Sequence, residues 1–203
     1  TIVIATGYRL RELPLPGSSM FHSSVYYRTA GKQTEFAGKR VAVIGGGDSA
    51  LIQCMELSES SPQVHLIHRN NKFRARPDLI TAVRNNPKVN IMLETEVDSL
   101  IGQKKLSGLQ VISSRSGEVK DIEAECVLIK VGYVPNTEPF KGQINMDATG
   151  HILIDRNCQT NLPGIFAVGD LTKPGYPRIA VAAGHGAIAT AQIRSMIENN
   201  VKV

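Results

Sequence analysis

The chain has 203 residues and a formal net charge of +5, and 42% of its residues are hydrophobic. This length can bury a core without disulfide or metal staples. Nucleic-acid binding has little support, because the positive charge forms no long run and only 5% of residues are aromatic. Neither a signal peptide nor a membrane-length apolar stretch is visible, so we expect a cytoplasmic protein that binds neither nucleic acid nor membrane.

The three cysteines, Cys54, Cys126 and Cys158, lie far apart in the sequence. They form no Cys-x-x-Cys pair and have no zinc-type spacing. This usage is typical of a reducing compartment and argues against a metal site or a disulfide framework. We expect ordinary core or surface thiols.

The first expected element is a strand in the apolar run of residues 1–7, which opens the chain without Met. A proline-containing linker follows. Beyond it, the pattern predicts a strand over 41–44, a helix over 49–58 and a second strand over 64–67. Two parallel strands joined by a helix form a βαβ unit.

The middle of the chain first continues this alternation, with a helix expected over 77–86 and a third parallel strand over 89–93. The pattern then changes. Strands over 106–113 and 119–125 then form an antiparallel excursion, and a buried strand over 126–132 returns from it.

The C-terminal part begins with a loop-rich segment over 133–150. Short strands are expected over 152–154 and 164–170, and a long helix over 179–198. The predicted class is therefore α/β, a Rossmann-like domain with a parallel sheet and an antiparallel excursion.

Glycines follow the strand at 41–44 directly. In a dinucleotide fold the first glycine permits the tight turn, the second admits the pyrophosphate and a third small residue lets the helix pack on the strand. Gly45, Gly47 and Ala50 fill these places in order. The helix that follows offers backbone N–H groups and a positive dipole end to phosphates. The alternative is a merely flexible turn, but the strand–turn–helix–strand context favours a nucleotide.

The end of the second strand distinguishes two cofactors. An acidic residue there binds the ribose 2′-hydroxyl of NAD, whereas Arg accommodates the 2′-phosphate of NADP. The chain has His68-Arg69 at this place, with Lys72 and Arg74 close behind and no acidic residue before Asp78. These cations favour NADPH over NADH. A solvated basic loop is the alternative.

Four segments of the chain together resemble one family. They are Gly45-Gly46-Gly47-Asp48-Ser49-Ala50, His68-Arg69 with Phe73-Arg74-Ala75, the segment 131–137 and the segment 164–170. They resemble the low-molecular-weight thioredoxin reductase family of FAD-dependent oxidoreductases, within the pyridine nucleotide-disulfide oxidoreductase superfamily. The resemblance covers almost the whole chain.

The resemblance implies an FAD domain that is split by an inserted NADPH domain. Residues 1–37 would be a partial FAD-binding domain with a linker, 38–150 the NAD(P)H-binding domain, and 151–203 the C-terminal part of the FAD-binding domain. The family's FAD-binding Gly-x-Gly-x-x-Gly would lie upstream of Thr1. We therefore expect a C-terminal fragment that is inactive without the missing FAD half, in which the linkers 36–38 and 146–150 act as hinges.

The resemblance also assigns site residues. Gly169-Asp170 matches the position that binds the ribityl chain, and Arg178-Ile179-Ala180 matches the helix start that faces the flavin ring. No catalytic side chain is expected, because hydride passes between the cofactors themselves. The full set of expected cofactor-binding residues is Gly45, Gly46, Gly47, Asp48, Ser49, Ala50, His68, Arg69, Arg74, Gly132, Gly169, Asp170, Arg178, Ile179 and Ala180.

Two features depart from the family pattern. Thioredoxin reductases carry a redox Cys-x-x-Cys, whose thiolate attacks a disulfide, shortly before the nucleotide strand. Tyr27 and Ala30 stand where those cysteines would fall. Asn70-Asn71 replaces a further Arg and an Asp, which weakens the case for NADP.

Ferredoxin or flavodoxin NADP reductases of the thioredoxin-reductase type also lack the cysteines. The leading hypothesis is therefore the NADPH-binding portion of an FAD-dependent oxidoreductase that passes electrons to a small redox carrier protein. The alternatives are a thioredoxin reductase-like disulfide reductase and a non-catalytic NADP(H)-binding module. FAD and a homodimer are expected for the full-length parent.

Overall fold

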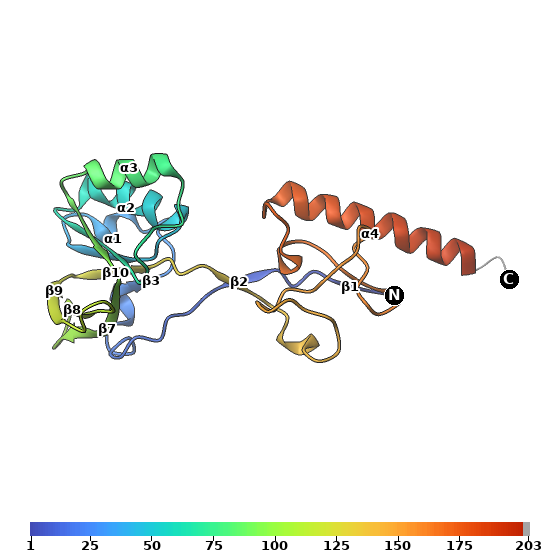
Figure 1. Cartoon of the computed structure of the whole chain (residues 1–203), viewed down its shortest axis with the longest axis horizontal. Helices are drawn as coiled ribbons and strands as arrows, with labels where there is room; N and C mark the ends of the chain where they lie inside the picture. The colour runs from blue at the N-terminus through green and yellow to red at the C-terminus, as the bar shows by residue number, and fades with distance from the viewer. Residues whose placement is uncertain (201–203) are drawn as a thin grey trace. The chain divides into compact units, whose positions relative to one another are not determined.

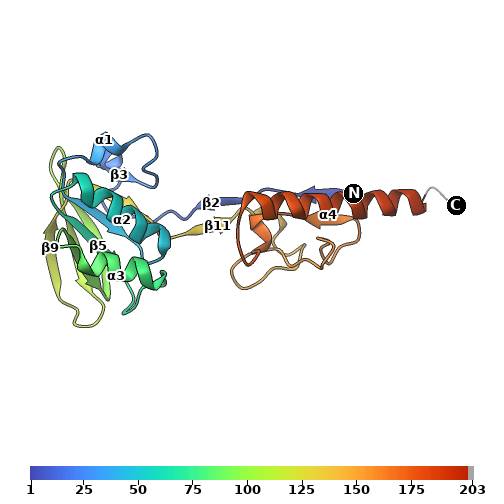
Figure 2. The same ribbon diagram turned by 90° about the horizontal axis from the view of Figure 1, so that it is seen from above.

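The computed structural model describes residues 1–200, which form two compact units (Figures 1 and 2). Unit 1 consists of residues 1–10 together with the chain from Tyr133 onward, and unit 2 spans Arg11–Gly132. The units divide the chain at residues 10/11 and 132/133, whereas the binding domains expected from the sequence divide it at 37/38 and 150/151. The assignment of either unit to a cofactor remains a prediction.

Unit 2 is built on a parallel sheet of five strands in the order β3-β10-β4-β5-β6. All four strand pairings are parallel, as the βαβ pattern predicts. Strands β4, β5 and β10 are buried throughout, which explains why their sequences read as continuous apolar runs. The strand bounds are Val25–Tyr26 for β3, Val41–Ile44 for β4, Val64–His68 for β5, Val89–Leu93 for β6 and Cys126–Ile129 for β10.

Helices α2 (Asp48–Ser60) and α3 (Pro77–Asn85) pack on one face of this sheet, with the short α1 (Gln33–Phe36) beside them (Figure 1). Alternate residues of each strand point to opposite faces. Val41 and Val43 of β4 therefore join the helix-side core, and Ala42 and Ile44 join the core on the other face.

An antiparallel sheet of three strands, β7-β8-β9, covers that other face. Its strands are β7 (Thr95–Gly102), β8 (Leu106–Ser113) and β9 (Val119–Glu123). The predicted fold class, a parallel sheet with an antiparallel excursion, is confirmed. Unit 2 also contains a 3₁₀ turn, η1 (His22–Ser24).

Unit 1 contains two strand pairs and one long helix. Strand β1 (Ile2–Ile4) pairs in parallel with β12 (Ile165–Ala167), and β2 (Tyr8–Leu10) pairs antiparallel with β11 (Tyr133–Pro135). The other elements are the 3₁₀ turns η2 (Glu138–Phe140) and η3 (Asp170–Thr172), and helix α4 (Ile179–Asn200).

The predicted strand over 152–154 is wrong. Ile152 forms only an isolated bridge to Met146, because its N–H donates to the carbonyl of Leu171 instead of to a neighbouring strand. Helix α4 matches its prediction closely. Across residues 1–200, no helix is both long enough and apolar enough to cross a membrane.

Candidate nucleotide-binding site

The glycine turn in unit 2 joins the end of β4 to the start of α2, and its first two glycines are held closely. Gly45 has a φ of +152°, and a Cβ there would lie 2.4 Å from the carbonyl oxygen of Lys130. A Cβ on Gly46 would lie 2.3 Å from the imidazole of His68. A Cβ on Gly47 would meet open space. Only glycine therefore fits the first two positions without displacement of a neighbour.

The turn leads into the N-terminus of α2, where Gly47 is the N-cap residue. Ala50 is fully buried in the helix-side core, so the helix packs closely on the sheet, as expected for the third small residue. The N–H groups of Ala50 and Leu51 donate to the Gly47 carbonyl. Within residues 1–200, the N–H groups of Asp48 and Ser49 have no acceptor, and such groups at a helix N-terminus can bind an anion.

His68 ends β5 and lies against this turn. Its ring stacks on Phe73 with centroids 5.5 Å apart, and its Nε2 lies 3.1 Å from the Lys72 carbonyl oxygen. Burial lowers the pKa of His68, and the charges of Arg74 and Arg69 lower it further, against the opposing hydrogen bond to Lys72. The neutral ring, with its proton on Nε2, then donates to that carbonyl.

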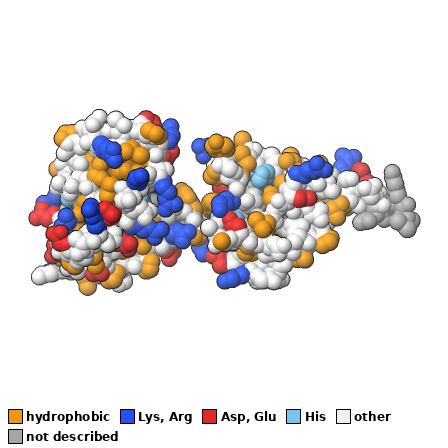
Figure 3. All heavy atoms as spheres, viewed as in Figure 1, with side chains coloured by type: hydrophobic (Ala, Val, Ile, Leu, Met, Phe, Trp, Pro, Cys, Tyr) orange, Lys and Arg blue, Asp and Glu red, His pale blue; other side chains and the backbone are white. Residues whose placement is uncertain are grey.

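The loop after β5 carries four cations, Arg69, Lys72, Arg74 and Arg76, all of them exposed. Arg76 pairs with two carboxylates, with its Nε 3.4 Å from Asp48 and its guanidinium 3.7 Å from Asp78. The other three have no ion-pair partner in the described part of the chain. In the space-filling view, Lys and Arg side chains gather on the visible face of unit 2 (Figure 3). Uncompensated cations beside a helix N-terminus favour an anionic ligand.

Two hydrogen bonds from backbone N–H groups hold this loop against the turn and the start of α2. The N–H of Arg74 donates to the Gly46 carbonyl at 2.7 Å, and the N–H of Arg76 donates to Asp48 Oδ1 at 2.8 Å. The sequence contains Asp48 and Arg76 but gives no signal that they meet, since their contact depends on the path of the loop. Phe73 belongs to a family motif, but the motif does not indicate that its ring orients His68.

Gly132 follows β10 with a φ of +93°, and its carbonyl accepts a hydrogen bond from the Arg11 N–H at 2.9 Å. This hydrogen bond therefore joins the first residue of unit 2 to its last. In the described residues, no hydrogen bond joins Gly132 to the glycine turn.

The remaining predicted residues lie in unit 1. Gly169 has a φ of +81° and caps η3, and its N–H donates to Nδ1 of His185 at 3.3 Å. Asp170 follows it and is half-buried. The predicted residues Arg178, Ile179 and Ala180 are all exposed at the start of α4.

A hydrogen-bonded network in unit 1 was not predicted. The Tyr8 hydroxyl lies 2.7 Å from His151 Nε2, and His151 Nδ1 lies 3.3 Å from Asp147 Oδ1. Thr149 and Lys173 complete the shell of Asp147, with the Lys173 ammonium 2.9 Å from its Oδ2. This network ties β2 to the turn at 147–151.

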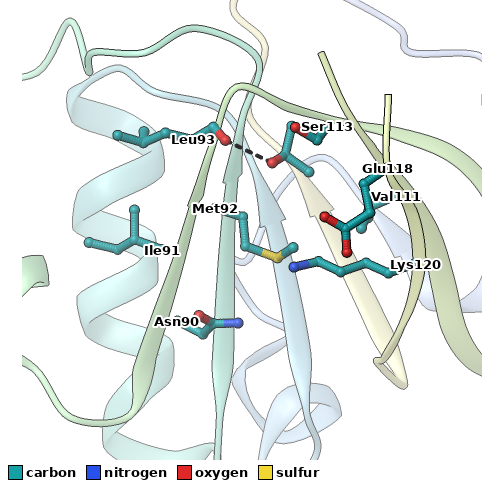
Figure 4. A pocket seen from close by; sticks show the side chains of 9 residues that line it. Asn90, Ile91, Met92, Leu93, Val111, Ser113, Glu118 and Lys120 are labelled. Carbon is teal, nitrogen blue, oxygen red and sulfur yellow. Dashed lines mark hydrogen bonds between the residues drawn. The ribbon is translucent and has the colours of Figure 1, made fainter. Parts of the chain in front are cut away.

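Two hollows lie away from the predicted residues. In unit 2, a pocket of about 290 Å³ lies between the edge strand β6 and the antiparallel sheet, where Lys120 and Glu118 point toward Met92 (Figure 4). In unit 1, a hollow of about 560 Å³ is lined largely by the loop over 134–150. None of the predicted cofactor-binding residues lines either hollow.

The three cysteines are all buried and unpaired. Burial raises the pKa of Cys54 to about 12 and also raises those of Cys126 and Cys158. A raised pKa leaves little thiolate at neutral pH, so none of the three has the environment of a reactive thiol.

The comparisons with known proteins fit this geometry. The model of the pyridine nucleotide-disulphide oxidoreductase family matches residues 1–186. The chain belongs to this family. It is a family of FAD-dependent oxidoreductases that use a pyridine nucleotide, and the predicted resemblance is confirmed.

Relatives of this family member include two kinds of reductase. A thioredoxin reductase from Streptomyces coelicolor is 32% identical over 93% of this chain and 59% of its own length. One component of the alkyl hydroperoxide reductase from Pseudomonas putida is 34% identical over 94% of this chain and 37% of its own length. The chain thus spans between about a third and two thirds of the curated relatives' lengths.

Solved structures of thioredoxin reductases are also similar to this chain. The crystal structure of thioredoxin reductase from Lactococcus lactis has a TM-score of 0.86 and is 30% identical, covering 98% of this chain and 66% of that one. The thioredoxin reductase from T. acidophilum has a TM-score of 0.82 and is also 30% identical.

Proposed function

We propose that unit 2 binds NADPH as the electron donor of an FAD-dependent oxidoreductase. The observation that carries this proposal is a group of three cations beside the glycine turn between β4 and α2. These cations are Arg69, Lys72 and Arg74. None of them has an acidic partner within residues 1–200. A 2′-phosphate would supply the missing negative charge, and NADH has no such group.

The residues present fit a dinucleotide in three respects. Gly45 permits the tight turn, and Gly47, beside which a Cβ would meet open space, lets the backbone approach the pyrophosphate. The N–H groups at the start of α2 can bind its oxygens. The cations Arg69 and Arg74 lie beside His68 at this turn, whose N-cap residue Gly47 is followed by Asp48, Ser49 and Ala50 in the first turn of α2.

A double substitution of the cations tests the cofactor. Arg69→Ala with Arg74→Ala should weaken NADPH binding by about tenfold or more, because charge-assisted hydrogen bonds to the 2′-phosphate are lost. NADH binding should change little. Calorimetric titration of both nucleotides measures the two dissociation constants.

Arg115→Ala is the matched control, since Arg115 is an exposed cation of the same unit in the turn between β8 and β9. It should leave both constants unchanged. An equal loss of NADPH and NADH in the double variant would refute the 2′-phosphate assignment.

We also propose that unit 1 forms part of the FAD site. Gly169 and Asp170 would bind the ribityl chain. The residues Arg178, Ile179 and Ala180 would face the flavin ring. Gly132, the last residue of unit 2, belongs to the same proposal as a cofactor-binding residue. When bound, FAD supplies the acceptor for hydride from the nicotinamide. The side chains orient the cofactors, and we assign no catalytic acid or base. A homodimer of the full-length protein belongs to the same proposal.

The electron acceptor has two candidates. The relatives named as thioredoxin reductase and as part of an alkyl hydroperoxide reductase favour a disulfide-containing redox protein over a ferredoxin-type carrier. That candidate needs a redox dithiol, which the three buried cysteines of this chain do not supply. Tyr27 and Ala30, at the expected dithiol positions, favour the carrier instead. Comparing NADPH-dependent reduction of a protein disulfide and of a ferredoxin by the full-length protein separates the two.

A further inference from the structure

The loop between β5 and α3 is fixed to the glycine turn at two points. The N–H of Arg74 donates to the Gly46 carbonyl at 2.7 Å, which holds the loop by backbone alone. The N–H of Arg76 donates to Asp48 Oδ1 at 2.8 Å, so a side chain of α2 makes the second attachment. We call residues 74–76, held in this way, the clasp. Its position fixes where the Arg74 side chain begins.

Asp48 has a second effect through its charge. It lies in the first turn of α2, where its carboxylate would repel a bound phosphate. The carboxylate would also compete with that phosphate for Arg69 and Arg74. Its Oδ2 instead lies 3.4 Å from Arg76 Nε. Among the described residues, the Asp48 carboxylate therefore pairs with Arg76, whereas Arg69 and Arg74 have no acidic partner.

We propose that Asp48 is a positioning residue that determines the preference for a 2′-phosphorylated nucleotide. It anchors the clasp, and it pairs with Arg76 so that its charge does not neutralise Arg69 or Arg74. This inference rests on the proposed NADPH function. It adds that selectivity depends on an acidic residue that does not itself bind the phosphate.

Three variants of the whole chain separate the parts of this proposal. Asp48→Ala removes both the acceptor and the charge. Asp48→Asn removes the charge but keeps a side-chain oxygen that can accept from the Arg76 N–H. Asp78→Ala removes a carboxylate from the same guanidinium without touching the glycine turn, and so serves as the matched control.

The first readout is the ratio of NADH to NADPH dissociation constants from calorimetric titration. Loss of a carboxylate near the pyrophosphate affects both nucleotides alike, so the ratio isolates the 2′-phosphate. We expect Asp48→Ala to lower the ratio about fivefold or more, a difference of about 1 kcal/mol. Asp48→Asn should restore most of the ratio, and Asp78→Ala should keep it.

The second readout needs no nucleotide. Amide hydrogen exchange at Arg74 and Arg76 should be faster in Asp48→Ala than in the unchanged protein or in Asp48→Asn. Exchange in the interior of α2 should stay the same, which shows that the helix itself remains folded.

Each other outcome overturns the proposal. An unchanged ratio in Asp48→Ala, or an equal loss of both nucleotides, would reduce Asp48 to a structural residue. An Asp48→Asn variant as impaired as Asp48→Ala would show that charge, and not the anchored clasp, matters. If the unchanged protein bound neither nucleotide, the proposed function itself would fail and the selectivity role with it.

Discussion

Gly46 and His68 show how a single residue sets the shape of the nucleotide turn. The His68 ring occupies the space that any side chain at residue 46 would need, with atoms 2.3 to 2.5 Å from an added Cβ. The ring cannot swing aside easily, since it stacks on Phe73 and bonds to the Lys72 carbonyl. The packing of the His68 ring therefore requires a glycine at residue 46.

Gly46→Ala should consequently displace His68 and, with it, the loop at 69–76. We expect a loss of about 1–3 kcal/mol in the free energy of unfolding, typical of overpacking, together with weaker binding of both nucleotides. Urea unfolding and calorimetric titration measure the two effects. Gly47→Ala is the control, because its Cβ meets open space, and it should cost less than about 1 kcal/mol as an N-cap change. Equal losses in the free energy of unfolding of the two variants would contradict the steric argument.

At this scale, the sequence shows which charged residues follow the strand but not how they pair. Arg69 and Arg74 follow from their place after a strand, since parallel strands bring their carboxyl ends to one edge. The pairing of Asp48 with Arg76 spans 28 residues and depends on the backbone path of a loop. No local propensity encodes such a path.

Among the elements, the turn at 147–151 holds a network of polar side chains around Asp147. Asp147 accepts hydrogen bonds from the His151 N–H, from Thr149 and from Lys173. Desolvation raises the pKa of Asp147, but these hydrogen bonds outweigh it and leave the pKa well below its usual range. The ionised carboxylate is therefore the form that the fold prefers.

This preference predicts acid sensitivity in unit 1. A carboxyl with a lowered folded pKa stabilises the fold above its unfolded pKa of about 4, and this contribution is lost as the pH falls through the folded pKa. Asp147→Asn should therefore lower the melting temperature at pH 7, and its difference from the unchanged protein should shrink toward pH 3. Lys173→Met should show a smaller effect of the same sign. Parallel pH curves for all three proteins would contradict this role.

The elements also differ in how well their sequences reveal them. Strands β4, β5 and β10 are buried on both faces, and their apolar runs are unambiguous. No strand was expected over β7, because register shifts between Val97 and Ser99 and between Ile101 and Gly102 break its alternation. The segment 152–154 has apolar residues typical of a strand but no neighbour that offers a ladder. A hydrophobic pattern shows which face of a segment is buried, but it does not show which strand the segment pairs with.

For the whole molecule, the main feature is the division into two compact units. The binding domains expected from the family resemblance have their boundaries at 37/38 and 150/151. The structure instead ends unit 2 at Arg11 and Gly132, whose backbones are hydrogen-bonded to each other at 2.9 Å. Pairing between residues so far apart leaves no signal in either segment alone.

Both core clusters of unit 2 lie entirely within residues 11–132, one on each face of the parallel sheet. The proposed NADPH residues of the glycine turn and the following loop lie there too. A domain with its own core and neighbouring termini can in principle fold alone. Residues 11–132 expressed by themselves should therefore fold cooperatively and retain the NADPH preference of the whole chain.

Circular dichroism during heating measures cooperativity, and calorimetric titration measures both nucleotides. The same segment with Arg69→Ala and Arg74→Ala should unfold at a similar temperature but lose the preference for NADPH, since these exposed side chains contribute little to the core. A segment that folds but binds neither nucleotide would show that unit 1 supplies part of the site. One that unfolds without a cooperative transition would show that the two cores of unit 2 depend on residues outside 11–132.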